Sequence, residues 1–185
     1  MRPVRTKHCC KLVTDKQLYF SNSGPKLIEV QTRALDLNEP VDAVGCFLEF
    51  LYTGEYFPQK IANTHRLVND PAAPDLDTTG DQLLKHARVY VLADKFGMTK
   101  LKELAHSKVH CVKSSAKGEI AYARYVYATT PKEDDTIRRP VASFWAHRSH
   151  VLRAEAEFEF RQMCLEFPQF SFDVISRFSL YTLTM

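Results

Sequence analysis

The sequence predicts an α+β fold that is mostly α: a helical cluster with a small N-terminal sheet, followed by a helical extension. Apolar residues recur at helical spacing through most of the chain after residue 38. Alternating apolar and polar residues before Leu37 favour a strand there instead. With 45% hydrophobic residues in a chain of 185, there is enough apolar material for a packed core.

Two short elements are expected before residue 38. The segment 12–20 favours a short helix, because the Ser21–Pro25 cluster that follows it is a strong breaker. The alternation over 27–37 favours a strand that ends at Leu37.

The next element is a helix from about Asn38 to Thr53. Pro40 suits its first turn, where a missing N–H costs nothing, and Gly54 can supply the left-handed turn that ends it. Cys46 lies in this apolar pattern, where a free thiol packs as a small hydrophobic group. The predicted apolar face, at 100° per residue, consists of Val41, Val44, Phe47, Leu48, Leu51 and Tyr52.

Residues 57–80 contain three prolines among polar residues and predict a long, mobile loop. The helix that follows from Asp81 is apolar around much of its circumference, so it should be buried on more than one side. Asp94 projects onto its apolar arc and should be hydrogen-bonded or paired with Lys or Arg. The 95–97 segment ends this helix, and another is expected over 98–112.

Four further helices are expected towards the C-terminus. The first two cover about 120–128 and 137–152, the third carries an apolar stripe over 160–167, and the last opens at Pro168. Pro140 should lie in the first turn of its helix or mark its start, because proline disrupts a helix interior.

Composition excludes several classes of function. A net charge of +3, from 25 basic and 22 acidic residues, gives no concentrated basic surface for nucleic acid. No apolar run reaches the ~18–20 residues that a membrane span needs. The five cysteines are an odd number without a Cys-x-x-Cys pair, and the basic N-terminus has no following apolar stretch. These features predict a cytoplasmic or nuclear protein with reduced thiols.

No catalytic motif is present, so the sequence predicts a protein that is not an enzyme and needs no cofactor. It lacks Gly-x-Ser-x-Gly and a glycine-rich phosphate loop. His106 and His110 have the spacing that places two imidazoles on one helix face for a metal, but no third ligand is evident. Solvent-exposed histidines are the simpler interpretation, and the same holds for His147 and His150.

Two sequence runs carry a resemblance to a known family. Phe47–Tyr56, which reads FLEFLYTGEY, resembles the helix-and-turn signature of BTB/POZ domains, and His86–Phe96 resembles the helix after it. The segment 121–170 is similar to the helical extension of fungal members. The resemblance implies a BTB/POZ-like domain over 8–113, with a mobile insertion at 57–80 and N-terminal strands missing, and an extension over 117–183.

What the resemblance implies about function is a non-catalytic protein–protein interaction module. Such a module acts as an adaptor or scaffold, linking a substrate to a cullin-type ubiquitin ligase, and it self-associates or pairs with other BTB proteins. One alternative is a transcription-associated oligomerisation subunit; another is a metal-dependent enzyme that uses His106 and His110. The implied partner-binding residues are Phe47, Glu49, Tyr52, Glu55 and Tyr56. Phe47 and Tyr52 also fall on the apolar face of their helix, where packing alone would explain them.

Overall fold

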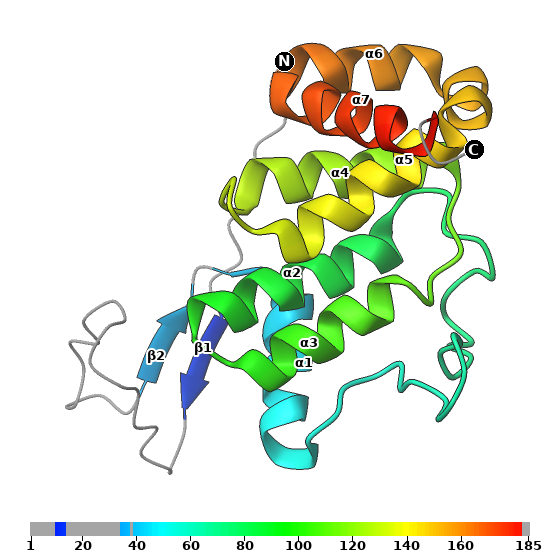
Figure 1. Ribbon diagram of the computed structural model, residues 1–185. Helices are drawn as coiled ribbons and strands as arrows, with labels where there is room; N and C mark the ends of the chain where they lie inside the picture. The colour runs from blue at the N-terminus through cyan, green and yellow to red at the C-terminus, as the bar shows by residue number, and fades with distance from the viewer. Residues whose placement is uncertain (1–9, 14–33, 38, 183–185) are drawn as a thin grey trace, which may run out of the picture.

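The computed structural model describes residues 10–13, 34–37 and 39–182, with side chains over 39–178. Figure 1 shows α1, α2 and α3 as one layer of helices and α4 to α7 as a second, thicker layer, in which α4 and α5 lie between the first layer and α6 and α7. In the described part of the chain, no helix has both the length and the apolar character needed to cross a bilayer. The helices are α1 (Val41–Thr53), α2 (Asp81–Lys95), α3 (Thr99–Val109), α4 (Ala116–Thr129), α5 (Asp135–Glu155), α6 (Glu157–Glu166) and α7 (Pro168–Thr182).

The mostly helical class is confirmed, whereas the small sheet flanking the helices is not. Strands β1 (Cys10–Val13) and β2 (Ala34–Leu37) pair antiparallel as a ribbon to one side of the helices (Figure 1). A two-stranded ribbon of this length is only marginally stable on its own, so it does not supply the expected layer. The helix predicted from residue 12 is wrong at its start, which lies in β1, and the rest of it falls outside the described residues.

Helix α2 is the centre of the fold. It packs against α1 and α3 in its own layer and against α4 in the other, which confirms that it is buried on more than one side. Its apolar residues are distributed around the cylinder because three helices cover it. The buried side chains are Leu83, His86, Ala87, Val89, Tyr90, Leu92 and Ala93.

The end of α1 agrees with the prediction, but the helix begins at Val41, so Pro40 is its N-cap residue and does not lie in its first turn. Its buried face also differs from the predicted one. The Pro40 carbonyl accepts from the Val44 N–H at 3.1 Å, and Gly54 has the left-handed φ of 76° expected after the last turn. Phe47 packs on Phe96 with ring centroids 5.2 Å apart. The buried side chains are Ala43, Val44, Cys46 and Phe47, whereas Val41, Leu51 and Tyr52 are exposed. Because α2 is the main neighbour of α1, only the face turned towards α2 is covered.

The second layer encloses an aromatic core. Trp145 stacks on Phe160 with centroids 5.2 Å apart, and Phe170 meets Trp145 edge-on at 6.1 Å. These rings come from α5, α6 and α7, so they join the three helices. Such aromatic pairs contribute about 0.5–1.5 kcal/mol each beyond the area they bury.

The prediction for Pro140 is wrong. Helix α5 begins at Asp135, so Pro140 lies in its second turn and cannot donate a hydrogen bond to the Thr136 carbonyl one turn earlier. A hydrogen bond between the ring of His106, on α3, and the Thr136 backbone acts to raise the pKa of that imidazole.

The long loop 57–80 ends at a close approach between two glycines. Gly80 has a φ of 88°, and an added Cβ there would lie 2.8 Å from the Gly118 carbonyl oxygen. The backbone of Asp77 also lies close to Gly118. A Cβ added to Gly118 would lie 2.8 Å from the Asp77 carbonyl oxygen. Only hydrogen atoms fit between these backbones. The loop is present as predicted between α1 and α2, and its mobility stays a prediction.

Gly118→Ala is expected to destabilise the fold by about 2 kcal/mol, because backbone atoms must move apart to admit the methyl group. Gly45→Ala is the matched control: it is also helical, and a Cβ there meets nothing within 4 Å. That change should stabilise the protein by about 0.5–1 kcal/mol. Urea unfolding of both variants measures the difference, and equal effects of the two would contradict the close approach.

Candidate interaction surface

An exposed tyrosine lies in the last turn of α1, directly before a turn fixed by hydrogen bonds. Gly54 closes the helix by donating its N–H to the Phe50 carbonyl at 2.8 Å. The Thr53 hydroxyl lies 2.8 Å from the Glu49 carbonyl oxygen and 2.7 Å from that of Glu55, and it accepts from the Glu55 N–H at 3.2 Å. These short bonds fix the chain direction immediately after Tyr52, whose side chain is 76% exposed.

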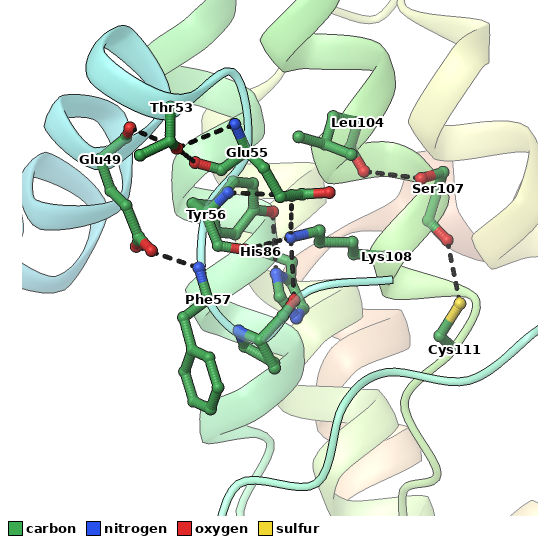
Figure 2. Close-up of polar contacts among 11 residues, drawn as sticks. Glu49, Thr53, Glu55, Tyr56, Phe57, His86, Leu104, Ser107, Lys108 and Cys111 are labelled. Carbon is green, nitrogen blue, oxygen red and sulfur yellow. Dashed lines mark hydrogen bonds and ion pairs between the residues drawn. The ribbon is translucent and has the colours of Figure 1, made fainter. Parts of the chain in front are cut away.

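A buried lysine holds the turn from beneath (Figure 2). Lys108 reaches across from α3, and its ammonium group donates to the carbonyl oxygens of Tyr56 and of Pro58, the latter at 2.8 Å. The same Nζ lies 2.6 Å from Oε1 of Glu55 and 3.6 Å from the centre of the Tyr56 ring. The Lys108 side chain is fully buried. Burial lowers its pKa, and the hydrogen bond and charge of Glu55 act in the opposite direction.

The aromatic ring above this ammonium group is tied to the central helix. The Tyr56 hydroxyl lies 2.9 Å from Nδ1 of His86 on α2, and both side chains are buried. Burial lowers the pKa of His86 to about 3, with Lys108 and Lys85 adding to the effect, so the imidazole is neutral. Burial also raises the pKa of Tyr56, so the phenol keeps its proton and shares a hydrogen bond with His86.

Lysine, histidine and tyrosine together are a chemically capable set, but this cluster is closed. Lys108 and Tyr56 are 0% exposed and His86 is 1% exposed, which leaves no access for a substrate. The Lys108 ammonium group, the Tyr56 hydroxyl and Nδ1 of His86 already have protein partners, as buried polar groups require. The cluster therefore shapes the turn instead of reacting.

The five predicted partner-binding residues separate into three environments. Phe47 is 3% exposed and Tyr56 is 0% exposed, so both belong to the core and neither offers a surface to a partner. Tyr52 is exposed, which contradicts the alternative prediction that it serves only to pack the core. The carboxylates of Glu49 and Glu55 are half-buried, and they accept from the backbone N–H groups of the next turn: Glu49 at 3.0 Å and Glu55 at 2.9 Å.

A second exposed apolar surface lies on α6 and α7, and the sequence did not single it out. A groove of about 340 Å³ runs between α5, α6 and α7. Phe170 and Val174 of the predicted apolar stripe are buried, whereas Phe178 lies at the groove and is half-exposed. The exposed apolar side chains of these two helices are Phe158, Leu165, Phe172, Ile175 and Phe178.

The two histidine pairs differ in geometry. His106 and His110 face each other with their Nε2 atoms 3.3 Å apart, whereas His147 turns its Nδ1 to the Ser143 carbonyl at 2.7 Å. Burial lowers the pKa of both His106 and His110. Among residues 10–13, 34–37 and 39–182, no cluster of three or more His, Cys, Asp or Glu side chains is placed to hold a metal.

Asp94 has the basic partner that the sequence predicted. Its carboxylate lies 2.7 Å from the ammonium group of Lys102, which also approaches Asp134 at 3.3 Å. Tyr90 completes this network by donating to Asp134 at 2.9 Å. Asp94 is nevertheless exposed, so the prediction that it lies on a buried apolar arc is wrong.

No family model, no curated protein and no solved structure matches this chain. The functional interpretation therefore draws on the resemblance of its sequence runs and on the geometry described above.

Proposed function

We propose that this protein is a non-catalytic interaction module of the BTB/POZ type, an adaptor that links a bound protein to a cullin-type scaffold. The observation that carries the proposal is the exposed Tyr52 side chain in the last turn of α1, directly before a turn that Lys108 holds from below. A backbone that is already ordered loses little conformational freedom on binding. Tyrosine is also among the residues that contribute most to binding at protein interfaces.

The surroundings of Tyr52 suit a protein partner. Leu51 is 38% exposed beside it, and Glu49 and Glu55 supply partly exposed carboxylates at its edge. Apolar and aromatic groups surrounded by polar ones are the usual arrangement of a protein-binding surface. The proposed partner face therefore consists of Glu49, Leu51, Tyr52 and Glu55, without Phe47 and Tyr56.

Tyr52→Ala is expected to weaken binding to a purified cullin N-terminal domain about 30-fold, equivalent to a loss of about 2 kcal/mol at an aromatic hot spot. Because the Tyr52 side chain is 76% exposed, its removal should leave the free energy of unfolding within about 0.5 kcal/mol of wild type. Isothermal titration calorimetry measures the affinity, and urea unfolding measures the stability.

Phe158→Ala is the matched control for this experiment, because Phe158 is a 71% exposed aromatic residue on α6, in the other layer. It should bind the cullin domain as tightly as wild type. Equal affinity of wild type and Tyr52→Ala, or no binding by wild type, would contradict the adaptor proposal. A loss in Phe158→Ala alone would move the interaction to the α6–α7 surface.

A further inference from the structure

We propose that His106 and His110 form a two-histidine site for a divalent transition metal ion, with Zn²⁺ as the representative. This inference is independent of the proposed adaptor function. His106 lies in the last turn of α3, and His110 is the C-cap residue, which keeps a right-handed helical conformation. The two residues are four apart, so their side chains lie on the same face. Their Nε2 atoms are 3.3 Å apart, and the rings are nearly perpendicular, at 88°.

The separation of the two nitrogens suits a shared tetrahedral ion. Two histidine nitrogens, each ~2.05 Å from zinc at a tetrahedral angle, lie about 3.3 Å from each other. A hydrogen bond between them would use one nitrogen as donor and the other as acceptor. At 3.3 Å the nitrogen–nitrogen distance lies beyond the usual hydrogen-bond range of about 2.7–3.2 Å, so this bond is weak. Replacing its proton with a metal ion therefore costs little hydrogen-bond energy.

The ring of His106 is linked to the backbone of α5. Pro140 leaves the Thr136 carbonyl without a helical donor, and the ring of His106 forms a hydrogen bond with the Thr136 backbone. Because Nε2 of His106 faces His110, Nδ1 is the nitrogen left for this bond. A histidine that donates Nδ1–H to a carbonyl has its tautomer fixed with the Nε2 lone pair free, as ligand histidines in metal sites do.

Some of the charges near the two histidines favour a bound cation and others oppose it. Asp134 is close enough to influence His106 and supplies a negative charge, whereas Lys60 and His65 act on His110 as positive neighbours. His110 is exposed, so water can reach the ion and complete its coordination. Two imidazoles with water ligands favour Cu²⁺, Ni²⁺ and Zn²⁺ over Mg²⁺ or Ca²⁺, which prefer oxygen.

Titration of the full chain with ZnCl₂, followed by calorimetry, tests the site. Wild type should show a binding component of one ion per chain that His106→Gln and His110→Gln each weaken by at least about tenfold. The double variant His147→Gln/His150→Gln is the matched control and should retain this component. Ions held elsewhere in the chain are common to all variants and do not change the comparison.

Pro140→Ala tests the positioning of His106 separately. Alanine restores an N–H that competes for the Thr136 carbonyl, so zinc binding should weaken by about tenfold although both histidines remain.

Imidazole ¹⁵N spectra of wild type keep the proposal testable if a glutamine variant fails to fold. Zinc should shift the Nε2 signals of His106 and His110. Affinity unchanged in both single variants, or zinc shifts confined to other histidines, would overturn the proposal.

Discussion

Lys108→Met is expected to lower the free energy of unfolding by about 3–5 kcal/mol, because it removes a buried ammonium group from two backbone carbonyls and from the half-buried carboxylate of Glu55. Methionine retains the apolar stem of the side chain, so the loss reports the ammonium group. The variant leaves the carbonyl oxygens of Tyr56 and Pro58 without their donor, and it leaves Glu55 without its cation. Unsatisfied buried acceptors cost about 1–3 kcal/mol each.

Urea unfolding of the full chain, monitored by circular dichroism, measures the effect. Lys100→Met is the matched control, because Lys100 is an exposed lysine of the same helix and should change stability by less than about 0.5 kcal/mol. If Lys108→Met is as stable as Lys100→Met, the turn after α1 is not held by the buried ammonium group. The proposed rigidity beneath Tyr52 would then be wrong.

Asp77→Ala is expected to destabilise the protein by about 3 kcal/mol, since a buried carboxylate that caps α2 is lost. Its Oδ1 accepts from the Gly80 N–H at 2.7 Å, and its Oδ2 accepts from the N–H groups of Gln82 at 2.9 Å and Leu83 at 3.1 Å. Asp77 is only 1% exposed, so water cannot replace these bonds. The negative charge also lies at the positive end of the helix dipole.

The backbone of Asp77 ties the loop to the start of α4. Its N–H donates to the Lys113 carbonyl at 2.9 Å, and its carbonyl accepts from the Ser115 N–H at 3.0 Å. Asp75→Ala is the control, because Asp75 is exposed in the same loop. Thermal unfolding compares the two variants. A similar melting temperature for both would show that the carboxylate of Asp77 does not cap α2.

The helices were largely predictable because their signals are local. Gly54 ends α1 and Pro168 opens α7, as expected from glycine and proline geometry. The apolar circumference of α2 correctly indicated a central helix. The ends of α5 were less accurate, since Pro140 lies in its second turn, where proline is disfavoured.

The candidate surface was only partly predictable, because exposure depends on which neighbours cover a helix. Phe47 and Tyr52 lie on one predicted stripe, yet α2 covers the former and leaves the latter exposed. Lys108 was missed, although it follows Leu101 by seven residues and so shares an apolar helix face. Asp77 was also missed, although an aspartate shortly before a helix start is a recognised capping signal.

Hydrogen–deuterium exchange of the full chain, with and without a purified cullin N-terminal domain, tests the central proposal most directly. We expect added protection over residues 49–57, where Tyr52 is presented by the turn that Lys108 holds. Protection confined to α6 and α7, or an exchange pattern unchanged at saturating cullin, would contradict it.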